Sequence, residues 1–159
     1  MEFRGMRRFN QQISYSDCIR LLEKEPRGVL AVNGENGYPY ALPVDFWYNP
    51  ENGKIYFHGA KEGNKIDLLK QNNKVSFCVM DKGYKIEGEW PLHIRSVIIY
   101  GRIRFIDDPE KTVELVRELA RRYYPGEEEI EYEIQRAGSR IQMLELIIDH
   151  MTGKEVKES

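Results

Sequence analysis

The chain has few cysteines, no long apolar run and no excess of one charge. Its 159 residues include two cysteines, 24 basic and 26 acidic side chains, with a formal net charge of -2. Two cysteines, Cys18 and Cys78, are too few for a disulfide framework or a zinc site, so both are predicted to be core thiols. The balanced charge gives no general footprint for nucleic acid or for an anionic membrane.

No apolar stretch reaches the ~18 residues of a membrane span, and the N-terminus lacks the apolar segment of a signal peptide. We therefore expect a soluble cytoplasmic protein without nucleic-acid or membrane partners. The length fits one domain over residues 1–159, on a prior of ~100–200 residues per domain. Residues 1–12 are polar and basic, and we expect them to lie across the surface.

The stretch KIYFHGAKEGNKIDLLK, residues 54–70, is predicted to run from a strand through a small-residue loop into a short helix. Ile55, Tyr56 and Phe57 are β-branched or aromatic and follow an Asn-Gly turn. Apolar residues behind Asn64, a favoured N-cap type, predict the helix.

A phosphate group fits this loop. Gly59, Ala60 and Gly63 keep side chains away, so that backbone N–H groups can approach a ligand oxygen. Lys65 places a cation on the first helical turn, which the helix dipole disfavours by a few tenths of a kcal/mol up to about one. An anionic ligand would explain that cation. An ordinary strand-to-helix turn with a solvated lysine is the alternative interpretation.

The remaining pattern predicts strands joined by tight turns, with few helices. Pro39 and Pro43 each remove a ladder donor, so the strand from Tyr38 to Tyr48 must be bulged or lie at an edge. Gly101 indicates a bulge or a barrel corner. Further elements are expected at these positions: helices from Ser14 or Ser16 to Pro26, from Asp108 to Pro125 and over 127–137, and strands over 28–32, 74–81, 95–106 and 141–149. This order is typical of an antiparallel barrel.

Six segments together resemble the flavin-binding split-barrel family of pyridoxamine 5'-phosphate oxidase-like proteins, and within it the nitroimidazole-resistance branch. They are RGVLAV, NGYPYALPVDFWY, GKIYFHGAKEGNKIDLL, NNKVSFCV, RSVIIYGR and LELIIDHMTGKE. The resemblance covers nearly the whole chain. It implies a mainly β fold with helices (α+β), a six-stranded antiparallel split β-barrel. It also implies a homodimer with an FMN in each of two clefts between the subunits.

The resemblance also implies roles for particular residues. His58 would lie near the cofactor as the candidate catalytic residue, and Lys65 would bind the phosphate beside the loop of Gly59, Ala60 and Gly63. Two further groups of cofactor-binding residues are implied, a strand along the flavin ring and the start of a strand lining the cleft: Pro43, Val44 and Asp45, then Arg95 and Ser96. No metal site is expected, because no ligand spacing joins the three histidines.

The chain departs from the oxidases proper at two points. Those enzymes carry an arginine in the second strand as a further phosphate ligand, where this chain has Ala41 or Leu42, and this departure bears on its affinity and preference for FMN. Their arginine-rich C-terminal segment is also absent, which argues against vitamin B6 oxidation. The expected function is an FMN-dependent oxidoreductase that reduces nitro-aromatic or other small electron-poor compounds, with the redox chemistry residing in the flavin. The alternative is a flavin- or haem-binding protein without turnover, used for storage or sensing, because fold does not fix function.

Two residues admit a structural and a functional interpretation. A histidine at a strand end, such as His58, is often a hydrogen-bonded structural residue, whereas the resemblance places it beside a cofactor. Asp45 lies in an otherwise apolar strand, where a buried carboxylate needs a partner.

Overall fold

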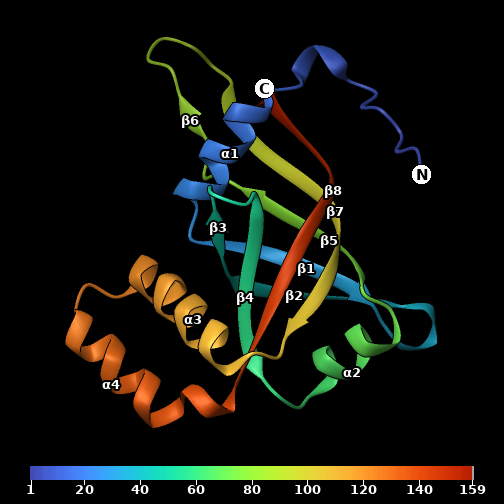
Figure 1. Ribbon diagram of the computed structural model, residues 1–159. Coiled ribbons are helices and arrows are strands. Elements are labelled where there is room, and N and C mark those ends of the chain that lie inside the picture. Colours follow the sequence, from blue (N-terminus) through green and yellow to red (C-terminus); the bar gives the residue numbers. More distant parts are fainter. Residues whose placement is uncertain (159) are drawn as a thin grey trace.

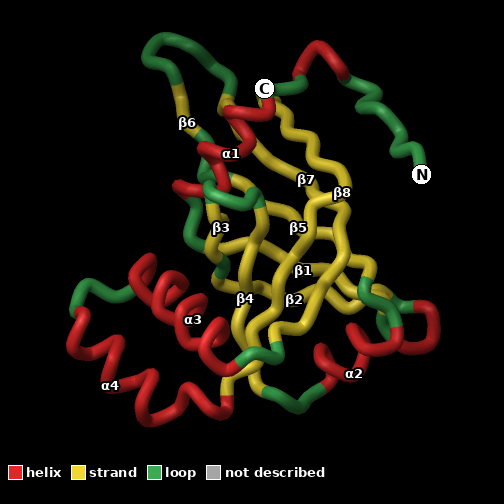
Figure 2. Tube along the Cα trace, viewed as in Figure 1, coloured by secondary structure: helices red, strands yellow, loops and turns green. Residues whose placement is uncertain are grey.

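The computed structural model describes residues 1–158 and consists mainly of one antiparallel sheet that curls around a core (Figures 1 and 2). The strands follow the order β2-β1-β5-β7-β8-β4-β3, and β6 pairs with β7 outside this path. The sheet's strands have these bounds: β1 Arg27–Asn33, β2 Pro39–Asp45, β3 Trp47–Asn49, β4 Lys54–Ala60, β5 Lys74–Met80, β6 Tyr84–Lys85, β7 Leu92–Ile106 and β8 Ile141–Glu158.

The two edges of the sheet are two halves of one chain segment, which makes this a split barrel. β2 pairs with β1 and β3 pairs with β4, while only Phe46 separates β2 from β3. Phe46 is fully buried, so the bend turns the side chain into the core. The prediction that the strand carrying Pro39 and Pro43 lies at an edge is confirmed, because the outer side of β2 needs no ladder donors.

The split-barrel fold class is confirmed, but the strand count differs from six. The single strand expected over 38–48 is divided at Phe46, and the irregular stretch 82–94 contributes the short β6. β7 begins at Leu92, three residues before the expected Arg95. β8 continues to Glu158, well past the predicted end at Asp149, because it pairs with β7 from Met143 to Glu158. The register shifts between Tyr100 and Gly101, which confirms the predicted bulge.

Four α-helices lie around the barrel: α1 Tyr15–Lys24, α2 Asn64–Gln71, α3 Pro109–Tyr123 and α4 Glu127–Ala137. Ser14 caps α1 by accepting from the Asp17 N–H at 3.1 Å, and Asp108 caps α3 by accepting from the Glu110 N–H at 3.0 Å. The prediction that Asn64 is the N-cap of α2 is wrong. Asn64 is the first helical residue, and the cap position belongs to Gly63 at φ 136°, a backbone conformation that favours glycine.

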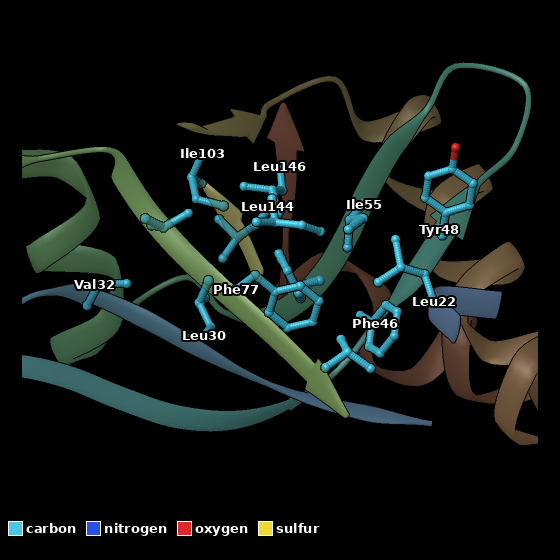
Figure 3. Close-up of a cluster of buried hydrophobic side chains, with 14 of the residues drawn as sticks. Leu22, Leu30, Val32, Phe46, Tyr48, Ile55, Phe77, Ile103, Leu144 and Leu146 are labelled. Carbon is cyan, nitrogen blue, oxygen red and sulfur yellow. The ribbon is translucent and has the colours of Figure 1, made fainter. Parts of the chain in front are cut away.

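The barrel interior holds the main core, shown in Figure 3, where side chains from facing strands point toward one another. Leu30, Phe77, Ile99, Leu144 and Leu146 are fully buried there. A second, smaller core lies outside the barrel, where Tyr56 and Met143 meet Leu115, Val116 and Leu119 of α3. Both cysteines are free thiols, and Cys18 is buried in the main core, as predicted. The prediction of a core thiol is wrong for Cys78, which is only partly buried because it lies on the face of β5 opposite Phe77. The two cores fix α3 against β4 and β8.

Among residues 1–158 no helix combines the length and the apolar character that a membrane crossing requires.

Candidate functional site

The end of β4 carries the predicted site residues, and its alternating side chains separate two environments. Ile55 and Phe57 point into the barrel core, while Tyr56 faces the second core under α3. His58 lies two residues beyond Tyr56 and therefore on the same face of the strand. Unlike Tyr56, His58 retains an exposed surface. The strand thus passes from the hydrophobic interior to the surface between Tyr56 and His58.

Lys65 folds back from α2 over Gly59 at the end of β4. A Cβ built on Gly59 would meet the Lys65 Nζ at 2.9 Å, so the ammonium occupies the space that a side chain would need. Burial lowers the pKa of Lys65, and among residues 1–158 no neighbouring carboxylate opposes that effect. A half-buried cation without a counter-charge is unfavourable unless an anion completes it.

His58 lies near one anionic and one cationic side chain. Its pKa is lowered, first by burial and also by the nearby Lys65, while Asp45 acts to raise it. The three side chains therefore form a group close enough to interact electrostatically, and we call Asp45, His58 and Lys65 the strand-end cluster. His58 is predominantly neutral at pH 7, and its imidazole can accept as well as donate a hydrogen bond.

Asp45 has the partner that a carboxylate in an apolar strand requires. The Arg27 Nε lies 2.9 Å from the Asp45 Oδ1, and the two residues face each other in the register of β1 and β2. The preceding Pro43 and Val44 lie on the same edge strand, opposite Val29 and Gly28. The structure thus places this segment beside the end of β4, with its outer backbone edge unpaired.

A cleft of about 850 Å³ opens next to the strand-end cluster, between α3, α4 and the ends of β2 and β4. Asp45 and His58 line one side of it, and both helices supply the other. The volume falls within the usual range of small-molecule sites, roughly 300–1,000 Å³. Figure 1 shows α3 and α4 side by side near the start of β8.

Arg95 and Ser96 lie elsewhere in the chain. Ser96 pairs with Lys154 of β8, whereas Gly59 pairs with Gln142 of the same strand. These positions are about twelve residues apart on β8, roughly 40 Å at about 3.3 Å per residue. Arg95 is held by Glu155, with its Nε 3.0 Å from the carboxylate Oε1. Within one chain, neither residue joins the strand-end cluster.

Sequence reasoning missed the helical half of the site. Tyr123 of α3, Tyr132 of α4 and Tyr124 between them line the cleft, although no motif marks them. Arg27 was missed because its role depends on cross-strand register. A tyrosine-rich pair of consecutive helices was the one visible signal, and only tertiary packing brings it to His58.

The residues at the end of β4 fit a phosphate group of a cofactor. The observation that supports this fit is the space beside Gly59, which is occupied by the end of the flexible Lys65 side chain. Gly63, with its positive φ, allows the loop to turn into α2 so that the first N–H groups of the helix remain available. Within residues 1–158, no three His, Cys, Asp or Glu side chains gather in a way that could hold a metal ion.

Solved structures with the same fold are similar over nearly the whole chain. A candidate 5-nitroimidazole antibiotic resistance protein from Bacteroides thetaiotaomicron matches with a TM-score of 0.76 and 21% identity, covering 92% of this chain and 87% of that one. An FAD- and heme-binding protein from Mycobacterium smegmatis matches with a TM-score of 0.73 and 19% identity, covering 94% of this chain and 74% of that one. An FAD-binding protein from Mesorhizobium loti matches with a TM-score of 0.66 and 20% identity, covering 92% of this chain and 97% of that one. At these identities the likeness shows the fold.

No curated protein matches the chain in sequence. A family model does, over residues 14–155, and its description is pyridoxamine 5'-phosphate oxidase. That range runs from the cap of α1 to the last part of β8, and it includes the whole strand-end cluster. The chain therefore belongs to the pyridoxamine 5'-phosphate oxidase family.

Proposed function

We propose that this protein binds a flavin, FMN, with its phosphate at Lys65 and the loop of Gly59, Ala60 and Gly63. The observation that carries the proposal is the half-buried Lys65 ammonium over Gly59, which no carboxylate of the described chain neutralises. A phosphate there gains a charge-assisted hydrogen bond and the first N–H groups of α2. Membership of the family and the flavin-binding names of similar structures support the same ligand class.

The flavin ring then lies along Pro43, Val44 and Asp45, beside His58. The backbone of this edge strand has unpaired N–H and C=O groups on its outer side, which can hydrogen-bond the polar edge of a flavin. His58, whose pKa is lowered by burial so that the neutral ring is favoured, orients a hydrogen bond toward the flavin ring or toward a substrate above it. The bound flavin would supply the electron transfer, and the protein supplies binding and orientation.

The functional unit in this proposal is a homodimer formed through the outer face of the sheet. Val29, Cys78, Ile98 and Thr152 stand in one cross-strand row on that face. Val29 and Ile98 are about two-fifths exposed, and Met80 of β5 even more so. A partly exposed and mainly apolar row in register across four strands is typical of a protein-protein interface. Such a dimer can also bring Arg95 and Ser96 of one chain to the cofactor of the other.

The proposed activity is the reduction of small electron-poor compounds, nitro-aromatic ones among them. The structural likeness to the candidate nitroimidazole resistance protein favours this class. A flavin- or haem-binding protein without turnover is the second candidate, favoured by the likeness to the FAD- and heme-binding protein. Anaerobic addition of NADH or NADPH, followed by a nitro-aromatic acceptor, separates the two, because only the oxidoreductase bleaches and then recovers the flavin spectrum.

The test of the binding site is a titration of the flavin-free protein with FMN and, separately, with FAD. Lys65→Ala should weaken FMN binding by on the order of 1.5–3 kcal/mol, or about 10- to 100-fold. Lys70→Ala is the matched control, since Lys70 is an exposed lysine at the other end of the same helix. If Lys65→Ala and the parent bind FMN with equal affinity, the phosphate binds elsewhere. If the parent binds FAD more tightly than FMN, the ligand is FAD.

The dimer is tested by Ile98→Glu, which places a charge in the centre of the exposed row. We expect sedimentation to show a dimer for the parent and a monomer for the variant, with a large loss of FMN affinity in the monomer. Lys157→Glu is the control, because Lys157 is an exposed residue of the neighbouring strand. A flavin-loaded monomer of the parent at micromolar concentration would contradict this part of the proposal.

A further inference from the structure

The cleft beside His58 has a chemical character of its own. Its floor is apolar, with Val116, Leu119 and Ile130 buried and Ile134 partly buried. Three tyrosines stand around that floor: Tyr123 at the end of α3, Tyr124 just after it and Tyr132 of α4. Tyr124 and Tyr132 are more than three-fifths exposed, so their rings are available to a ligand. A cavity of about 850 Å³ with this lining suits a compact ring-containing molecule.

The charged residues that line the cleft all carry the same sign. They are Asp45, Glu128, Glu129 and Glu133, and within the described chain no lysine or arginine lines the cavity. Arg27 neutralises Asp45 from β1, and Arg136 neutralises Glu133 along α4. Glu128 and Glu129 have no ion pair among residues 1–158. Two carboxylates at the mouth of an apolar, tyrosine-lined cavity therefore remain uncompensated.

Helix stability explains why carboxylates occur in the first turn of α4, but it does not explain why two of them line the cleft. Carboxylates in the first turn of α4 are favourable for the helix dipole, and Glu127 in that turn serves the same purpose while binding Arg121 at 2.9 Å outside the cleft. Glu128 and Glu129 instead face the cavity that His58 shares. Arg122 of α3 does not line the cleft. Its guanidinium lies over the Phe46 ring and, at 5.7 Å, over the Tyr123 ring, and it donates to the Phe46 carbonyl.

We propose that this cleft binds a small organic cation, a quaternary or protonated amine on an aromatic or alicyclic body, next to His58. The tyrosine faces attract the cation through their ring quadrupoles, Glu128 and Glu129 attract it by charge, and the apolar floor takes the body. Any reaction of the bound cation as a substrate of the flavin site rests on the proposed function. The binding of the cation to the cleft is independent of the proposed function.

The test is isothermal titration calorimetry of the full chain with three probes of similar size: benzyltrimethylammonium, benzyl alcohol and phenylacetate. We expect the cation to bind at least about fivefold more tightly than the neutral alcohol, and phenylacetate to bind most weakly. The double variant Glu128→Gln/Glu129→Gln should lower the affinity for the cation and narrow its preference over the alcohol to the part that the tyrosine rings supply, while the affinity for the alcohol stays unchanged.

The matched control is Glu127→Gln/Glu131→Gln, which removes two carboxylates from the same helix. Those residues pair with Arg121 and Arg117 and do not line the cleft, so the preference for the cation should persist. Equal affinity for all three probes, or the same loss in the control, would overturn the proposal. Titrations of the flavin-free and the FMN-loaded protein keep the two proposals separate, because cation binding without FMN binding would refute only the proposed function.

Discussion

Tyr56 and His58 stand two residues apart on the same face of β4, yet their surroundings are opposite. The Tyr56 hydroxyl donates to the Glu145 Oε2 at 2.7 Å and accepts from the Asn52 Nδ2 at 2.9 Å. Glu145, itself buried, is paired with Arg104 at 2.8 Å. We call these residues the Glu145 network. His58, in contrast, has charges near it, but neither Asp45 nor Lys65 forms a hydrogen bond that accounts for its pKa.

The difference separates structure from function along one strand. In the Glu145 network each buried polar group has a partner, so the network holds β4, β7 and β8 together and leaves nothing for a ligand. In the strand-end cluster, Lys65 has no counter-charge within the part of the chain that the structure describes, and His58 lines a cleft. A site that must bind an anion keeps its hydrogen-bonding capacity unused in the free protein. Each prediction below perturbs one side of this comparison.

The largest expected effect is on the Glu145 network. Glu145→Ala removes the acceptor that Tyr56 and Arg104 share and leaves a cavity, and should cost about 3 kcal/mol of the free energy of unfolding. Urea denaturation measures that loss. Asp149→Ala is the control on the same two strands, since the Arg102–Asp149 pair is largely solvated and exposed pairs contribute about 0–1 kcal/mol. Equal losses in the two variants would show that the Glu145 network is not a special support.

The next effect concerns the cradle at Gly59. Gly59→Ala puts a methyl group where the Lys65 Nζ now lies, and the flexible lysine can move aside. Stability should therefore change by less than about 1 kcal/mol, while FMN binding weakens about tenfold because the ammonium is displaced.

A double-variant cycle checks that mechanism. In a Lys65→Ala background the Gly59→Ala change should cost little further FMN affinity, since the two act through one interaction. Additive losses in the FMN titration would mean that Gly59 contacts the cofactor independently of Lys65.

A smaller effect appears at alkaline pH. Burial, together with the hydrogen bond to Glu145, raises the pKa of Tyr56 to about 12. An unfolded tyrosine ionises near pH 10. The folded state therefore holds the proton longer, and the stability that Tyr56 contributes is present below about pH 10 and is lost as the pH rises toward 12.

Tyr56→Phe should lower the free energy of unfolding by about 1 kcal/mol at pH 7 and flatten its decline above pH 10. Urea denaturation at a series of pH values measures both. An unchanged decline in the variant would assign the alkaline sensitivity to other groups, among them Tyr123, whose pKa burial also raises.

Much of the barrel could be predicted from local pattern. Strand alternation, the caps Ser14 and Asp108, the edge position of two prolines and the bulge at Gly101 are properties of neighbouring residues, and all of them are present in the structure. The break at Phe46 could not be predicted, because it depends on which partner strands lie on either side. The extension of β8 to Glu158 also depends on pairing with β7, not on the apolar content of its own end.

The candidate site divides in the same way. His58, Gly59, Gly63 and Lys65 are close in sequence, so one motif was sufficient to place them together. Asp45 joins them through the curl of the sheet, which the resemblance anticipated and the pattern alone did not. The tyrosines of α3 and α4 reach the cleft only because the second core fixes those helices against β4, and no local signal records that packing.

The smallest effect is the most direct test of the strand-end cluster. Proton NMR of the imidazole should give His58 a pKa below its ordinary value near 6.5, because burial and Lys65 disfavour the charged ring. Lys65→Met should raise this pKa by removing a nearby cation. Asp45→Asn should lower it further by removing the anion that opposes that shift. Unmoved titrations in both variants would show that the three residues do not act as a group.

The lowered pKa of His58 also determines how its contribution to the free energy of unfolding changes with pH. A histidine whose folded pKa is depressed binds fewer protons in the folded state, so its full contribution to stability is present above pH 6.5 and declines as the pH falls below that value. His58→Asn keeps one donor and one acceptor but cannot be protonated, so it should preserve the fold and remove this part of the acid dependence. Urea denaturation between pH 5 and 8 measures the difference. If His58→Asn also leaves the flavin spectrum and steady-state turnover unchanged, His58 is a structural residue, and Tyr56 and His58 would then differ in exposure but not in role.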